Sequence, residues 1–145
     1  MNTENTAALT GLMVLPRGRH PKISSDRRAY LSSEQGHLSF QNDQNFASAL
    51  LKEGDHFQKG RLFLDEISWS DPDALETLLA YAQEEYLKNP SKFPLYLCVN
   101  KESLDLIRMA DHAGFTPYFG EWKESSEEQS QALWSELTDL LRNAG

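Results

Sequence analysis

The chain has a single cysteine and no long hydrophobic run among its 145 residues. One cysteine cannot form a disulfide within the chain, which argues against a disulfide-stabilised secreted scaffold. The apolar runs all fall short of the roughly 20 residues that a membrane-spanning helix needs. The segment 1–19 lacks a basic start, and its apolar stretch 12–15 is too short for the core of a signal peptide. We therefore expect a cytoplasmic protein that does not enter a membrane.

Motifs for several kinds of chemistry are missing as well. The sequence contains no Gly-x-Ser-x-Gly nucleophile elbow and no Walker phosphate loop. Its histidines show no metal-ligand spacing, so we expect no metal site. These histidines are His20, His37, His56 and His112. Cys98 lies in the apolar run 95–99, where we expect a buried, inert thiol rather than a nucleophile.

The net charge of −8 disfavours binding to nucleic acid or to an anionic membrane. Apolar residues make up 39% and charged residues 25%, as in ordinary globular proteins, and we expect residues 1–145 to form one domain. Positive charge is concentrated in residues 17–28, which hold five of the fourteen lysines and arginines. This segment is either a solvated basic loop that pairs with the acidic body or an arm that grips a phosphate group. It has no interleaved aromatic residues to stack on bases, so we do not expect nucleic-acid binding.

Hydrophobic periodicity predicts the elements of the first half of the chain. The polar residues 1–8 are expected to form a disordered tail. Strands are expected at 9–15, 28–31 and 37–40, the last two joined as a hairpin. A helix is expected next, with Asn42 or Asp43 as its N-cap and Gly54 at its end. Its apolar residues would be Phe46, Ala49, Leu50 and Leu51.

The second half alternates strands and helices, which predicts an α/β fold with helices packed on a sheet. A strand covered on both sides is expected from Arg61 to Trp69, with Phe63, Ile67 and Trp69 on one face and Leu62 and Leu64 on the other. Asp71 and Pro72 are expected to open a helix that ends at Asn89. A strand at 94–99, a helix at 101–113 stopped by Gly114 and a strand at 116–122 follow.

A last helix is predicted at the C-terminal end of the chain. Ser125 or Ser126 would be its N-cap and would form a capping box with Glu128 or Gln129. Trp134 flanks its apolar stripe, so this helix either packs on the sheet or docks a second chain.

The segment 60–124 reads strand, long helix, strand, helix, Gly114-Phe115 turn and strand. That order resembles the second half of the GNAT superfamily of N-acetyltransferases. The resemblance implies a mixed central sheet with flanking helices, to which the C-terminal helix would be an addition. It also implies acetyl-CoA as cofactor, bound along the strand 61–69 and at the start of the following helix. The cofactor-binding residues would then be Ile67, Ser68 and Trp69, and the catalytic residues Glu66 as general base and His112 as proton donor.

Two departures from the family pattern bear on activity. The run Ser68 to Ala74 stands where these enzymes have a glycine-rich phosphate loop, and it contains no glycine. Pro72 lacks one backbone donor, while Asp71 and Asp73 put negative charge where the phosphates would sit. In addition, counting back from Gly114 places Ala110 at the position of the family's catalytic tyrosine and Ser103 at that of its asparagine.

The leading hypothesis is therefore a GNAT-like domain that has lost acetyl-CoA catalysis. It would be a non-catalytic binding or regulatory module without a cofactor, acting with a protein partner or as a homodimer. One alternative is an active N-acetyltransferase with an atypical acyl-CoA site. Another is a small acidic interaction protein of the antitoxin, immunity-protein or chaperone type. Capping of the loop 68–74 by Asp71 or Asp73 would favour the first hypothesis, and a large apolar patch around Trp122 or Trp134 would favour the last.

Overall fold

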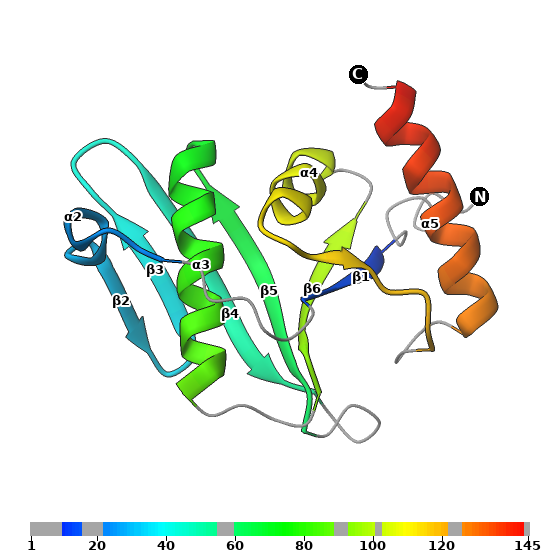
Figure 1. Ribbon diagram of the computed structural model, residues 1–145, viewed down its shortest axis with the longest axis horizontal. Coiled ribbons are helices and arrows are strands. Elements are labelled where there is room, and N and C mark those ends of the chain that lie inside the picture. Colours follow the sequence, from blue (N-terminus) through cyan, green and yellow to red (C-terminus); the bar gives the residue numbers. More distant parts are fainter. Residues whose placement is uncertain are drawn as a thin grey trace, which may run out of the picture.

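The computed structural model describes residues 10–15, 22–54, 60–88, 93–100, 103–121 and 126–143. These residues form a seven-stranded mixed sheet with four helices (Figure 1). The predicted α/β class, with flanking helices and a further helix at the C-terminal end, is confirmed. Several residues with sequence predictions lie outside the described residues. They are the tail 1–8, the part of the basic segment that precedes Lys22, and Trp122. No helix within the described ranges combines the length and the apolar character needed to cross a membrane.

The elements follow one another in the order β1 (Thr10–Leu15), α2 (Ser25–Arg28), β2 (Leu31–Glu34), β3 (His37–Gln41), β4 (Phe46–Glu53), β5 (Leu62–Trp69), α3 (Pro72–Lys88), β6 (Leu95–Asn100), α4 (Leu104–His112), β7 (Thr116–Pro117) and α5 (Glu127–Asn143). Across the sheet the strand order is β2-β3-β4-β5-β6-β1-β7. Neighbouring strands are antiparallel except β5 and β6, which are parallel and are connected through α3. The first strand of the chain thus lies between β6 and β7, a placement that the sequence did not predict.

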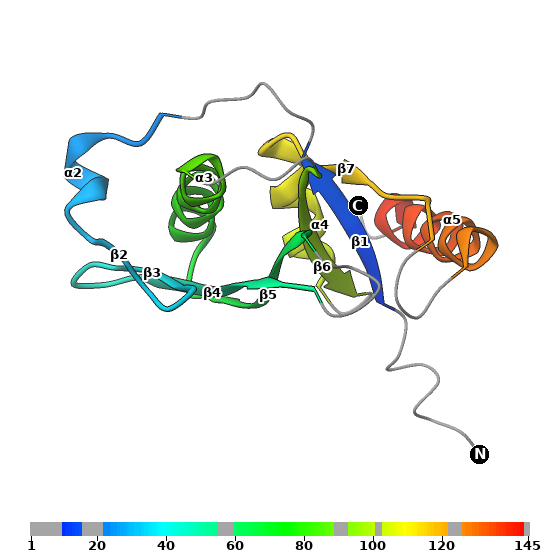
Figure 2. The ribbon, with the colours of Figure 1, turned by 90° about the horizontal axis from the view of Figure 1, so that it is seen from below.

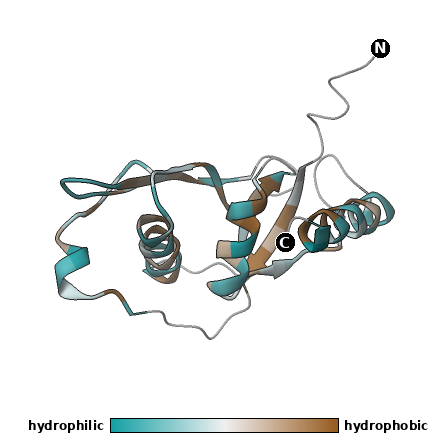
Figure 3. Ribbon diagram, turned by 90° about the horizontal axis from the view of Figure 1, so that it is seen from above, coloured by the Kyte–Doolittle hydropathy of each residue, from teal (hydrophilic) through white to brown (hydrophobic). Residues whose placement is uncertain are grey.

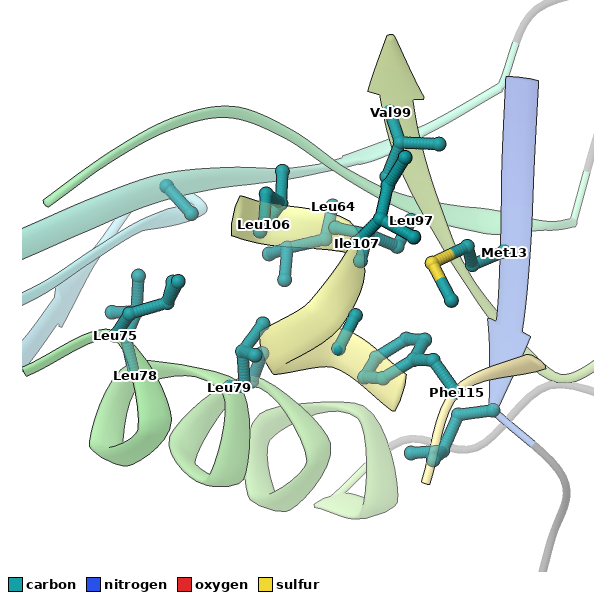
Figure 4. Close-up of a cluster of buried hydrophobic side chains, with 14 of the residues drawn as sticks. Met13, Leu64, Leu75, Leu78, Leu79, Leu97, Val99, Leu106, Ile107 and Phe115 are labelled. Atoms are coloured by element: carbon teal, nitrogen blue, oxygen red, sulfur yellow. The ribbon is translucent and has the colours of Figure 1, made fainter. Parts of the chain in front are cut away.

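The main hydrophobic core lies between the sheet and helices α3 and α4, which cover the same face (Figures 2 and 4). Each fully buried leucine in such a core contributes roughly 1.5–3 kcal/mol by leaving water. The largest fully buried side chains are Trp134, Phe115, Leu12, Met13, Leu38, Leu64, Leu75, Leu78, Leu79, Leu95, Leu97 and Leu137. Figure 3 shows hydrophobic residues concentrated where α4, β6 and β1 meet, and hydrophilic residues at the β2–β3 end of the sheet.

Helix α5 packs on the sheet beside β1 rather than standing free. Trp134 is only 2% exposed, and Leu133 and Leu137 are buried with it in the main core. A Cβ atom added to Gly11 of β1 would lie 2.7 Å from Leu133 Cδ2, so the two elements touch at this glycine. The capping box predicted for this helix is confirmed at Ser126 and Gln129 by two reciprocal hydrogen bonds. The Gln129 amide donates to the Ser126 hydroxyl, and the Ser126 amide donates to Gln129 Oε1.

The predicted hairpin between β2 and β3 is confirmed, with a shift at its start. Gln35 and Gly36 form its turn with positive φ angles of 52° and 84°, the backbone twist that suits a two-residue hairpin. Of the strand predicted at 28–31 only Leu31 belongs to β2, because Arg28 ends the short helix α2 and residues 29–30 form a turn. Ser24 caps that helix by accepting a hydrogen bond from the Arg27 amide at 3.3 Å.

The helix predicted after Asn42 is wrong, because this segment is strand β4. Asn42 Oδ1 does accept hydrogen bonds from the amides of Gln44 and Asn45. These bonds close a turn between β3 and β4, because an asparagine side chain can cap a turn as well as a helix. Ala47 and Ala49 then alternate into the core at the spacing of a strand.

Strand β5 is confirmed, but its predicted pattern of faces is wrong in the second half. The partners Ser48–Ser68 and Leu50–Asp65 leave two residues of β5, Glu66 and Ile67, opposite one residue of β4. This β-bulge resets the alternation. Ile67 and Trp69 therefore pack against the same core as Leu62 and Leu64, whereas Phe63 joins a small cluster on the other face.

The strand predicted at 116–122 is much shorter in the structure. Only Thr116–Pro117 form strand β7, and the Tyr118 amide makes one further hydrogen bond to the Leu12 carbonyl oxygen of β1, at 2.9 Å. Helix α4 spans Leu104–His112, within the predicted range 101–113. Gly114, which was predicted to stop it, follows the C-cap Ala113 with a φ of 104°.

Candidate functional site

The N-terminus of α3 is the point at which the resemblance would place the phosphates of acetyl-CoA. Here Asp71 is the N-cap, and its Oδ1 accepts a hydrogen bond from the Ala74 amide at 3.3 Å. The Asp71 carbonyl oxygen accepts the Leu75 amide at 3.2 Å. Pro72 has no amide hydrogen, and Asp73 adds a second negative charge. The first turn is thus capped by a carboxylate of the chain itself, as helix N-termini favour.

The three residues predicted to bind a cofactor do not converge on this helix end. Ile67 and Trp69 are half-buried and pack against the main core. Ser68 is exposed on the opposite face of the sheet, beside its partner Ser48. The loop that follows is held to β4, because the Ser70 hydroxyl accepts a hydrogen bond from the Phe46 amide at 2.8 Å.

Strands β5 and β6 separate toward their carboxyl ends. They pair only where residues 62–64 face residues 95–97, although β5 continues to Trp69 and β6 to Asn100. Figure 1 shows the two strands diverging, with α4 in front of the gap between them.

Glu66, the predicted general base, lies exposed in the β-bulge with a φ of 51°. A left-handed backbone costs a non-glycine residue roughly 1 kcal/mol. The Glu66 amide donates a hydrogen bond to Asp65 Oδ1 at 2.8 Å. Asp65 also forms an ion pair with Lys52 at 3.1 Å on the outer face of the sheet. Asp65 is therefore held in a structural ion pair.

Cys98 lies on the outer face of β6, partly buried. Burial, reinforced by the negative charge of Asp65, raises the pKa of Cys98 to about 12. The thiol is therefore protonated at neutral pH, which agrees with the expectation that it is not a nucleophile.

A cleft of about 640 Å³ lies between the segment 22–27, helix α3 and the C-terminal end of helix α4. Lys22 and Arg27 line one side, and His112 lies at the end of α4. Thr77 and Gln83 of α3 also line the cleft, and each is only 4% exposed. Its volume falls in the range of small-molecule sites, about 300–1,000 Å³.

Two arginines fasten the wall of this cleft to α3. Arg27 Nη1 donates to the Thr77 hydroxyl at 2.7 Å and to the Asp73 carbonyl oxygen at 3.4 Å. Arg28 makes a two-point contact with the Glu84 carboxylate, at 2.9 and 2.6 Å. In Figure 2, α2 lies beside α3 on the side of the sheet that carries the helices. Within the basic segment, Arg28 therefore pairs with a carboxylate of the acidic body, whereas Arg27 is bound by a hydroxyl and a carbonyl oxygen. Residues 25–28 form a short helix rather than a loop.

Charges around Arg27 are divided between two neighbouring hollows. The cleft carries Lys22, Arg27 and one carboxylate, Glu76. A smaller hollow of about 180 Å³ on the other side of Arg27 is lined by Asp26, Asp71 and Asp73. Among the described residues, no group of three or more histidine, cysteine, aspartate or glutamate side chains is arranged to hold a metal ion.

The pair Arg28–Glu84 predicts a pH-dependent contribution to stability. Hydrogen bonds from Arg28 lower the pKa of Glu84 in the folded protein. The stabilisation of the folded state by this ion pair is complete above the pKa of an unfolded glutamate, about 4.3. It disappears as the pH falls through the lower pKa of Glu84 in the folded protein. Glu84→Gln should lower the Tm by about 1–3 °C at pH 7. That difference should vanish near pH 3, measured by thermal unfolding across the pH range.

The matched control for this prediction is Glu136→Gln on the exposed side of α5. It removes the same charge without touching the segment 22–28, so its Tm should stay close to that of the parent at every pH. A constant difference between parent and Glu84→Gln down to pH 3 would contradict the role given to the ion pair.

The sequence predicted only part of this cleft. His112 lines it, but Glu66 is not among its lining residues, so the two predicted catalytic side chains occupy different places. Lys22, Arg27, Thr77 and Gln83 were not predicted as site residues. The basic composition of 17–28 was the available signal, but the sequence did not show that this segment crosses α3.

No family model, curated protein or solved structure that the chain was compared with matches it.

Proposed function

We propose that the chain is a GNAT-like domain that binds a ligand or a partner without transferring an acetyl group. It would regulate a protein partner or assemble as a homodimer. The observation that carries this proposal is the N-cap of α3, where the Asp71 carboxylate holds the Ala74 amide.

The family-like part of the proposal is supported by topology. Two adjacent parallel strands, β5 and β6, are joined by the long helix α3, and β6 is followed by α4 and the Gly114-Phe115 turn. The strands diverge toward their carboxyl ends. The N-terminal strand β1 beside β6 is a feature that the resemblance did not imply.

The loss of acetyl-CoA binding is supported by the electrostatics of the same helix end. A pyrophosphate bound there would have to displace the Asp71 carboxylate from the Ala74 amide. It would also lie close to the charge of Asp73, while Pro72 offers no amide hydrogen. Like charges at short range and a missing donor both disfavour the phosphate.

The alternatives are less well supported by the described residues. An N-acetyltransferase that uses both Glu66 and His112 would need them at one site, but only His112 lines the cleft. A pure interaction protein was expected to show an apolar patch around Trp122 or Trp134. Trp134 is buried against β1, and Trp122 lies outside the described residues. Among the described residues, three large hydrophobic side chains are exposed and offer contacts for a protein partner: Tyr30, Phe46 and Phe119.

Calorimetric titration with acetyl-CoA and CoA, at low and moderate salt, tests the proposal. A ligand at about 100 times its Kd stabilises a protein by roughly 2.7 kcal/mol, so a micromolar site would also raise the Tm clearly at millimolar ligand. We expect neither measurement to show acetyl-CoA or CoA binding with a micromolar Kd. Micromolar binding of acetyl-CoA would contradict the proposal and favour an N-acetyltransferase with an atypical site.

A further inference from the structure

We infer that the cleft between the segment 22–27, α3 and α4 binds a small organic anion with an apolar body. Its head would be a phosphate or carboxylate group. This inference goes beyond the proposed function, because it concerns a different site from the N-terminus of α3 and does not depend on the family resemblance.

The cleft carries more positive than negative charge. Lys22 and Arg27 supply two positive charges, and Glu76 is the one carboxylate among the lining residues. This balance stands out in a chain of net charge −8. Among the described residues, no ion pair joins Lys22 to Glu76. His112 adds an imidazole that can donate a hydrogen bond.

The guanidinium group of Arg27 is bound to α3 through one of its two terminal nitrogens. Both of its recorded contacts on α3 use Nη1, which donates to Thr77 and to the Asp73 carbonyl oxygen. Within the described residues, Nη2 has no hydrogen-bond partner. The guanidinium is thus positioned by the helix while part of its donor edge stays available to an oxyanion, which is the geometry that favours carboxylate and phosphate recognition.

The rest of the cleft lining is largely apolar. Leu79, Ala80, Ala113 and Phe115 contribute apolar surface, which suits the body of an organic ligand. Thr77 and Gln83 are two of the three buried polar residues in the described chain, and both line this cleft. A few polar groups on an apolar lining are typical of small-molecule sites.

The test uses the 145-residue chain, labelled with nitrogen-15, and four probes. Phenyl phosphate and benzoate each join an anionic head to an aromatic body, inorganic phosphate is the head alone, and benzyl alcohol is a neutral body. We expect saturable shifts of the amides of Ala80, Gln83 and Ala113, with a Kd below about 1 mM for at least one organic anion. The better of the two organic anions identifies the head group.

The matched variants separate the cleft from general charge. Lys22→Gln with His112→Gln should weaken binding at least tenfold, because it removes one charge and one donor from the cleft. Arg142→Gln also removes a positive charge, but on the exposed face of α5, and should leave the Kd unchanged. Both changes lie on exposed side chains, so the fold should be kept.

Three results would overturn the inference. They are no saturable shift with any anion at about 10 mM, equal binding by the double variant and the parent, or benzyl alcohol binding as tightly as the anions. Failure of the proposed function looks different. It would appear as acetyl-CoA binding that shifts the amides of Asp73–Leu75 and is insensitive to Lys22→Gln.

Discussion

Replacing Trp134 with alanine should lower the free energy of unfolding by about 3–5 kcal/mol, the usual cost of emptying a large buried aromatic site. Trp134 is 2% exposed and packs where α5 meets Gly11 of β1. The loss is expected because no neighbouring side chain can fill the volume of an indole without rearranging the contact between the helix and the strand. Urea unfolding, followed by circular dichroism, measures it.

Trp134→Phe is the matched control for this prediction. Within the described residues, the indole Nε1 is buried without a hydrogen-bond partner. Phenylalanine removes that unsatisfied donor while keeping an aromatic ring, so the loss should stay below about 1.5 kcal/mol. A loss of less than about 1 kcal/mol for Trp134→Ala would show that α5 does not contribute to the core as described.

Gly36→Ala should be the second strongly destabilising change, at about 2–4 kcal/mol. Gly36 has a φ of 84°, and a Cβ added there would lie 2.6 Å from the carbonyl oxygen of Leu51. That oxygen belongs to strand β4 and cannot rotate away. In addition, the Leu51 amide donates a hydrogen bond to the Gly36 carbonyl oxygen at 2.8 Å, which fixes the distance between the hairpin turn and strand β4.

Gly60→Ala separates the backbone strain from the clash. Gly60 has a similar φ of 86°, but its added Cβ would come no closer than 3.7 Å to Phe93. Only the left-handed conformation then costs energy, about 1–2 kcal/mol. Equal losses for the two variants would contradict the close contact between Gly36 and Leu51.

Elements whose signals are local were predicted well from the sequence. The N-cap at Asp71, the capping box at Ser126 and the helix end at Gly114 all depend on residues within one turn of each other. The same local reasoning failed at Asn42, because an asparagine that caps a turn looks like one that caps a helix. The apolar spacing of 46–51 fits both a helix and a strand, and its pairing with β3 decides the outcome.

Features that depend on distant parts of the chain could not be predicted. The bulge at Glu66 follows from the register between β4 and β5, which no residue of β5 alone encodes. The position of β1 between β6 and β7 is set by long-range packing. The cleft also depends on distant contacts, because Arg27 and Arg28 join a segment near the N-terminus to α3. The end of α4 contributes further lining residues. Of its charged residues, the sequence singled out His112 and the basic segment but could not place them together.

The central claim is that the N-terminus of α3 is closed to acetyl-CoA by the side chain of Asp71. Amide spectra of the nitrogen-15-labelled protein, recorded with and without about 5 mM acetyl-CoA, test it most directly, since that concentration would saturate any site tighter than millimolar. The resonances of Asp73, Ala74 and Leu75 should stay in place. Saturable shifts of these three amides would contradict the claim, because they would show a phosphate where the carboxylate now caps the helix.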